Sequence, residues 1–139
     1  MAGLARFVLP GIPHHVTQRG NGRQQTFFYD DDYQLYLDLL RTHCTANHVE
    51  IWAWVLMSNN VHLILTPAHK DGLRAALSRV HRAYAGHIHA REKRTGHFWQ
   101  GRFGCMAMDD EHLGAAPLPP NAGPKQNRRA RHNRGHACF

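Results

Sequence analysis

The sequence lacks an apolar stretch long enough to cross a membrane. Its longest apolar run, Ile51–Met57, has the length of one buried strand, whereas a transmembrane helix needs about 20 residues. The first ten residues, Met1–Pro10, have neither a charged start nor a long apolar stretch, so we expect no secretory signal. The sequence therefore predicts a cytoplasmic protein with no membrane partner.

The sequence has few cysteines, and their spacing does not indicate disulfide pairs. The three cysteines, Cys44, Cys105 and Cys138, are odd in number, far apart and form no Cys-x-x-Cys pair. A disulfide framework usually has an even number of cysteines at closer spacing. We therefore expect free thiols in a reducing compartment.

Acidic residues are missing from the C-terminal part of the chain. Five of the 17 basic residues follow Gly114 without a single acid, so residues 1–114 carry 12 bases against 10 acids. Most of the formal net charge of +7 thus lies in 115–139. A basic balance favours a polyanionic partner, but its location makes global charge alone a poor guide to the binding site. Few large apolar residues follow Gly114, which predicts a disordered basic tail at 114–139.

Residues 1–113 alternate between strand and helix patterns. Two segments, which begin at Asp30 and at Asp71-Gly72, have apolar residues at helical spacing. These residues are Tyr33, Tyr36, Leu37, Leu40 and Cys44 in the first and Leu73, Ala76, Leu77, Val80, Tyr84 and Ile88 in the second. Strand patterns cover 15–18, 50–56, 61–65 and 102–108. This order is that of the ferredoxin-like α+β sandwich, an antiparallel sheet with two helices on one face. We expect one domain, 1–113, followed by the tail 114–139.

Three segments of the sequence resemble one family in order and spacing. They are His14-His15-Val16-Thr17-Gln18-Arg19-Gly20-Asn21, Leu56-Met57-Ser58-Asn59-Asn60-Val61-His62-Leu63-Ile64-Leu65 and His97-Phe98-Trp99-Gln100-Gly101-Arg102-Phe103. They look like the IS200-like single-tyrosine transposases, in the branch of the REP-associated tyrosine transposases, which are HUH endonucleases of bacteria. The resemblance covers roughly residues 5–113.

The resemblance implies metal-dependent cleavage and joining of single-stranded DNA during transposition. A tyrosine hydroxyl attacks a phosphodiester in this family and forms a covalent link to DNA. Two histidines at i and i+2 of a strand hold a divalent metal, Mg²⁺ or Mn²⁺, that polarises the phosphate. Those positions are Asn60 and His62 here. Because an amide is a weaker ligand than imidazole for many metals, we expect weakened metal binding.

The family's catalytic helix has no counterpart in this sequence. That helix should follow Asp109–Leu113 and carry the nucleophilic tyrosine, but no tyrosine follows Tyr84, and prolines at 117, 119 and 120 oppose a helix. A frameshift is one explanation, since Pro117-Leu118-Pro119 can be encoded CCG-CTA-CCT, which contains Arg-Tyr-Leu in a neighbouring frame. We therefore predict a truncated transposase domain with no catalytic residue.

The resemblance also implies contact with single-stranded or hairpin DNA. The residues expected at that interface are His15, Arg19, Asn21, Arg23 and Arg102, of which Arg19–Arg23 form a flexible basic loop. Relatives act as dimers with exchanged tyrosine helices, and a homodimer is one assembly left open here.

Several residues have a plain structural interpretation beside the functional one. We expect Tyr84 to pack in the core rather than replace the nucleophile, and Cys105 to be a small core residue. Trp99-Gln100-Gly101-Arg102 is equally compatible with packing and with DNA contact. His81, His87 and His89 are expected to be solvated.

Three functions remain open on the sequence alone. The first is the family's enzyme activity, which needs a tyrosine at the site. The second is a module that binds DNA hairpins without catalysis. The third is the product of a decayed transposase gene with no selected role.

Overall fold

Strands and helices alternate along the chain in the predicted order. The structure, a computed structural model, describes residues 8–108 and 136–137. Its elements are β1 His14–Arg19, the 3-10 helix η1 Asn21–Arg23, α1 Asp30–Ala46, β2 Val49–Leu56, β3 Asn60–Pro67, α2 Gly72–Glu92, β4 Gly104–Ala107 and β5 His136–Ala137. Within these described residues, no helix is both long and apolar enough to cross a membrane.

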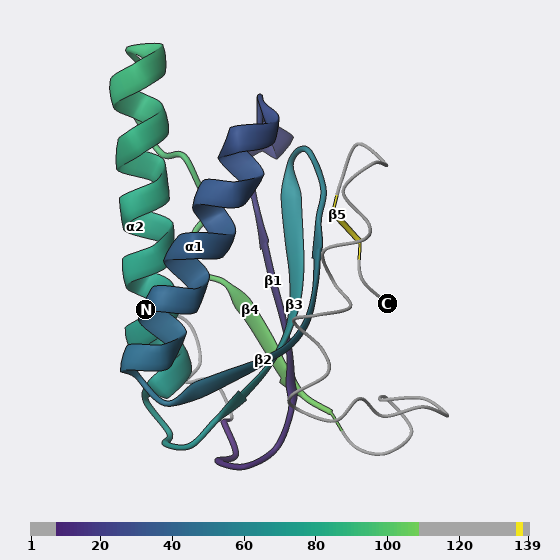
Figure 1. The fold of residues 1–139 in the computed structure, drawn as a ribbon. Coiled ribbons are helices and arrows are strands. Elements are labelled where there is room, and N and C mark those ends of the chain that lie inside the picture. The colour runs from purple at the N-terminus through teal and green to yellow at the C-terminus, as the bar shows by residue number, and fades with distance from the viewer. Residues whose placement is uncertain (1–7, 109–135, 138–139) are drawn as a thin grey trace.

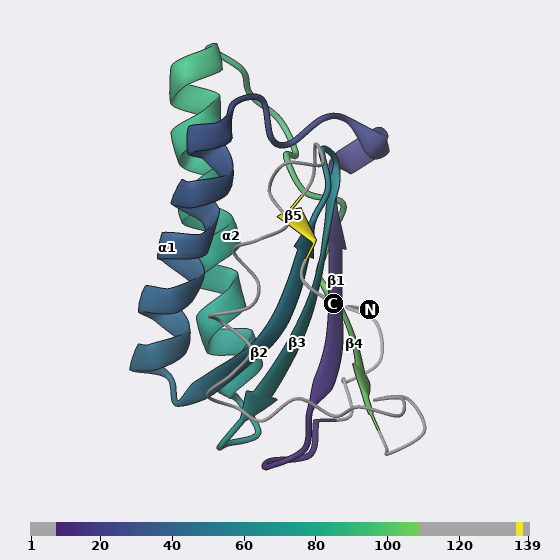
Figure 2. The ribbon, with the colours of Figure 1, turned by 45° about the vertical axis from the view of Figure 1, so that its right-hand side comes forward.

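The strands form one antiparallel sheet in the order β4-β1-β3-β2-β5, and both helices lie on one face of it (Figures 1 and 2). The predicted ferredoxin-like α+β arrangement is therefore confirmed. The predicted disordered tail, 114–139, lies outside the described residues except for His136 and Ala137. Those two residues pair with the end of β2.

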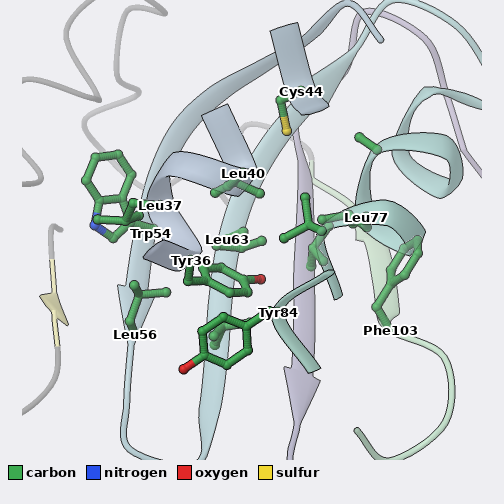
Figure 3. Close-up of a cluster of buried hydrophobic side chains, with 14 of the residues drawn as sticks. Tyr36, Leu37, Leu40, Cys44, Trp54, Leu56, Leu63, Leu77, Tyr84 and Phe103 are labelled. Atoms are coloured by element: carbon green, nitrogen blue, oxygen red, sulfur yellow. The ribbon is translucent and has the colours of Figure 1, made fainter. Parts of the chain in front are cut away.

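Alternation along the strands separates the core from the opposite face of the sheet. In β3, Val61, Leu63 and Leu65 are fully buried beneath the helices, whereas Asn60 and His62 alternate with them and are half-buried. The helices complete the core with the apolar faces that the spacing predicts (Figure 3). Burial of these faces from both layers supplies the main driving force for the fold.

Aromatic residues with polar ends fill the middle of the core. The Tyr84 hydroxyl donates to the Thr26 carbonyl oxygen at 2.7 Å, and the Trp99 indole N–H donates to the His81 carbonyl oxygen at 3.0 Å. Both side chains are buried. The expected core position of Tyr84 is confirmed. Of the two roles that the sequence left open for Trp99, packing and DNA contact, its buried position fits packing.

The expectation that His81 is solvated is wrong. His81 follows Leu77 by four residues and precedes Tyr84 by three, so it lies on the buried face of α2. Its Nε2 lies 2.8 Å from the Tyr36 hydroxyl, which satisfies a ring nitrogen inside the core. Burial lowers the pKa of His81 to about 3, so the imidazole is neutral.

A buried carboxylate holds the start of α1 to the end of α2. Asp32 accepts hydrogen bonds from the backbone N–H groups of Phe28 and Tyr29 and two from the Arg91 guanidinium, at 2.6 and 3.0 Å. Burial alone would raise the pKa of Asp32, but these hydrogen bonds outweigh it and hold the pKa below its ordinary value. The carboxylate therefore stays charged and fixes the chain that enters α1.

Candidate nucleic-acid interface

A groove of about 560 Å³ lies where the ends of β1, β3 and β4 meet the η1 loop. Among the described residues, its lining carries three guanidinium groups and several amides but no carboxylate. The lining residues are Thr17, Gln18, Arg19, Arg23, Asn59, Asn60, Val61, His62, Gln100, Arg102 and Gly104. Such a lining suits an anion with many oxygen acceptors, as in a nucleic-acid backbone.

Backbone hydrogen bonds from two distant segments, at Asn59 and at Phe98–Gln100, hold the loop that carries Arg19 and Arg23. The Gly20 N–H donates to the Asn59 carbonyl oxygen, and the Asn21 N–H donates to that of Phe98, both at 2.9 Å. The Gln100 N–H donates in turn to the Arg19 carbonyl oxygen at 2.9 Å. The loop expected to be flexible is therefore a tethered 3-10 turn, which holds its two arginines beside the sheet.

Steric crowding, and not a positive φ angle, requires glycine at position 20 of this turn. A Cβ atom at this position would lie 2.3 Å from the Gln24 carbonyl oxygen and 2.8 Å from the Thr26 methyl carbon. Both contacts are far inside van der Waals distance. Only glycine lets the turn close tightly enough to reach the Phe98–Gln100 segment.

Amide side chains lie beside the arginines in the groove. Gln18 is buried and donates from Nε2 to the Gly101 carbonyl oxygen at 3.2 Å, while Gln100 is exposed. Sequence reasoning did not single out Gln18, Asn59 or Gln100 as site residues. Gln100 lies inside the Trp-Gln-Gly-Arg segment, which was the signal available for it.

Two histidines from neighbouring strands meet beside the groove. His15 Nε2 on β1 lies 3.2 Å from His62 Nδ1 on β3, and the two rings are stacked with their planes 21° apart. Burial lowers the pKa of His62, and the nearby His15 and Arg19 lower it further. His62 is thus held neutral, in the form that accepts a proton or a metal ion.

Asn60 lies two residues before His62 on the same face of β3, and only one of its two side-chain polar atoms has a hydrogen-bond partner among the described residues. Its Nδ2 donates to Asn59 Oδ1 at 2.8 Å. Its Oδ1 is buried and has no hydrogen-bond partner among the described residues. A buried acceptor in this state favours a donor or a cation.

The residues present fit a divalent cation through neutral ligands. Asn60 supplies an oxygen and His62 a nitrogen from one face of one strand. Within the described part of the chain, no group of three His, Cys, Asp or Glu side chains could hold a metal. A cation here would rely on these ligands, on His15 and on oxygens from outside the chain.

Five of the seven sequence-predicted site residues line the groove, and they are Arg19, Arg23, Asn60, His62 and Arg102. His15 reaches the groove through its contact with His62. Asn21 is exposed in η1 and is not part of the lining. The segment expected to replace the tyrosine helix lies outside the described residues, and the roles of these side chains stay predictions.

Comparison with known proteins agrees with this arrangement. The family described as "Transposase IS200 like" matches residues 10–116. A solved REP-associated tyrosine transposase bound to a REP hairpin is 21% identical, with a TM-score of 0.62 over 79% of this chain and 64% of that chain. This chain thus spans less than two thirds of that relative.

A second solved structure, of a candidate transposase from Deinococcus radiodurans R1, is 23% identical, with a TM-score of 0.57 over 78% of this chain and 88% of that one. At these identities both structures show a shared fold. Among curated proteins, none matches the sequence. Because the family match covers most of the sequence, the chain belongs to the IS200-like transposase family.

Proposed function

We propose that this chain binds single-stranded or hairpin DNA in the groove at the ends of β1, β3 and β4, and does not cut it. The observation that carries the proposal is the lining, which holds Arg19, Arg23 and Arg102 with several amides and, in the described part of the chain, no carboxylate. Guanidinium groups bind phosphate oxygens, and amides bind phosphates or base edges. The relative that was solved with a REP hairpin supports DNA of this class as the ligand.

The positions of the tyrosines support the proposal that the chain does not cut DNA. The sequence has four tyrosines, and none of them lines the groove. Burial raises the pKa of Tyr84 far above its ordinary value, and its hydroxyl already donates to Thr26. A phenol in that state cannot reach a phosphodiester or ionise to attack it.

The binding unit of this proposal is residues 1–113, with 114–139 as an additional basic segment. Five basic residues in that segment would add contacts that do not depend on DNA sequence. A frameshift near Pro117 would account for the loss of a tyrosine helix. The nucleotide sequence decides this point, because codons that exclude a tyrosine in both shifted frames would rule the frameshift out.

Covalent trapping separates binding from cleavage. The full chain is mixed with an end-labelled single-stranded palindrome and Mg²⁺ or Mn²⁺, then resolved with and without denaturant. We expect slower mobility without denaturant and no adduct with it. The Arg19→Gln/Arg23→Gln variant should lose most of the shift, whereas Arg41→Gln, on the exposed side of α1, should keep it.

Other outcomes point to the two remaining functions. A denaturant-resistant adduct would show that the chain cleaves DNA and would overturn the proposal. Absence of both a shift and an adduct would contradict the proposal and favour the product of a decayed gene. An oligonucleotide of the same length without a palindrome distinguishes hairpin recognition from general binding to single strands.

A further inference from the structure

The stacked histidines join two strands that are far apart in the sequence. His15 and His62 extend from β1 and β3 on the sheet face opposite the helices, and both are half-buried. Their facing nitrogens are 3.2 Å apart and share a hydrogen bond, whose proton a bound cation would replace. Two nitrogens bound to one ion, each at about 2.1 Å, are separated by a little over 3 Å. The pair already has the spacing that a shared cation requires.

Asn60 adds an oxygen beside this pair. Residues 60 and 62 alternate on β3, so their side chains project from the same face. The hydrogen bond from Asn60 Nδ2 to Asn59 Oδ1 leaves Asn60 Oδ1 as a buried acceptor without a partner among the described residues. An uncompensated buried acceptor is costly, and a bound cation would remove that cost.

We propose that His15, His62 and Asn60 together bind a divalent transition-metal ion, with His15 supplying from β1 the second imidazole that Asn60 does not provide on β3. The site thus joins two strands instead of lying on one. Imidazole nitrogens suit Zn²⁺, Co²⁺ or Ni²⁺ better than Mg²⁺, which prefers oxygen ligands. The preferred ion is accordingly a softer one than the Mg²⁺ or Mn²⁺ expected from the sequence.

The ligands also predict a coupling between the cation and DNA, a point that rests on the proposed function. All three ligands are neutral, and no carboxylate of residues 8–108 lines the adjoining groove, which carries three arginines. A dication there keeps its full charge until an anion approaches. A DNA phosphate would supply both the missing charge and oxygen ligands, so cation and DNA should each strengthen binding of the other by the same factor.

Cobalt titration tests the site without DNA. The chain has 13 histidines, so weak background binding is expected in every variant. We measure the visible absorption of Co²⁺ and the heat of binding at neutral pH for the wild type, His15→Gln, His62→Gln and the matched control His87→Gln. His87 is exposed on α2, away from the pair.

We expect His15→Gln and His62→Gln each to weaken the first Co²⁺ equivalent by about tenfold or more, and His87→Gln to leave it within about twofold. Asn60→His should tighten it. If His15→Gln and His87→Gln behave alike while both remain folded by circular dichroism, the proposal is wrong. Tighter binding of Co²⁺ to His15→Gln than to the wild type would overturn it as well.

A second titration, with a single-stranded oligonucleotide present, tests the coupling. The wild type should bind Co²⁺ more tightly with DNA than without it, and His15→Gln should lose most of this difference. An equal Co²⁺ affinity with bound DNA would overturn the coupling. Failure of the oligonucleotide to bind at all would contradict the proposed function, and the DNA-free cobalt result would still decide the cation site.

Discussion

At the scale of single residues, His81 makes the stability of this protein depend on pH. Its pKa is about 3 in the core, against 6.5 when exposed. Between these values the unfolded chain binds a proton that the folded chain does not, so the free energy of unfolding falls as the pH falls below about 6.5. The limiting slope is about 1.4 kcal/mol per pH unit, which gives a loss of about 2 kcal/mol at pH 5.

A double variant isolates this contribution from those of other histidines. Tyr36→Phe/His81→Leu removes both partners of the buried hydrogen bond and leaves neither unpaired. Urea unfolding at a series of pH values should show a shallower decline for this variant than for the wild type. Parallel declines in the two proteins would mean that His81 takes up a proton without unfolding.

Substitution by alanine should change the stability of the protein in opposite directions at Gly20 and Gly86. Gly20→Ala places a methyl group 2.3 Å from the Gln24 carbonyl oxygen, and we expect a loss of about 1–3 kcal/mol in stability. Gly86→Ala, within α2, meets nothing within 4 Å and should stabilise by about 0.5–1 kcal/mol. Thermal unfolding of both variants checks this, and a stabilised Gly20→Ala protein would show that the turn is looser than described.

At the scale of elements, the Arg91–Asp32 pair determines how α1 and α2 meet. Asp32 is 2% exposed and Arg91 is 31% exposed. Arg91→Met leaves the carboxylate with only its two backbone donors, so we expect a loss of about 2–3 kcal/mol, less than for a fully buried pair. Arg94→Met, which removes an exposed hydrogen bond to Gln24, should cost less than about 1 kcal/mol by the same denaturant titration. Equal losses from the two variants would show that the carboxylate needs no guanidinium.

The elements themselves could be predicted from the sequence, but their register could not. Helical spacing located α1 and α2, and strand patterns located the hairpin of β2 and β3. Thr17 pairs with His62 across β1 and β3, which places His15 diagonally next to His62 on the same face. The contact between the two histidines therefore depends on the register of the two strands. No local pattern encodes that offset, so His15 was predicted to contact DNA and its pairing with His62 was missed.

The error over His81 has a different cause. Its spacing from Leu77 and Tyr84 placed it on the apolar face, but its polarity suggested solvent exposure. Burial became acceptable only because the Tyr36 hydroxyl, 45 residues away in sequence, faces its ring nitrogen. A polar residue at an apolar position can be predicted as buried only when its partner is known.

At the scale of the whole molecule, charge on the groove should govern the salt dependence of DNA binding. Each phosphate neutralised on a single strand contributes about 0.7 to the slope of log affinity against log salt. Arg19→Gln/Arg23→Gln/Arg102→Gln should therefore reduce the slope by about 2. Arg41→Gln should leave the slope unchanged, because Arg41 lies on α1 and pairs with Asp38.

Fluorescence anisotropy of a labelled oligonucleotide across a salt series measures these slopes. The wild type and both variants carry the same C-terminal basic residues, so contacts from those residues cancel in the comparison. An unchanged slope in the triple variant would place the phosphate contacts outside the groove.

The strand order also determines when this surface can exist during synthesis. β1 is made first, yet its neighbours in the sheet are β3 and β4, which the ribosome delivers much later. Until Gln100 emerges, no N–H is available for the Arg19 carbonyl oxygen, and until Gly104 emerges the last strand beside β1 is missing. The groove that we propose for DNA is therefore complete only after both helices have been synthesised. The long sequence separation of the β1 pairings makes folding slower than in a domain with only local contacts.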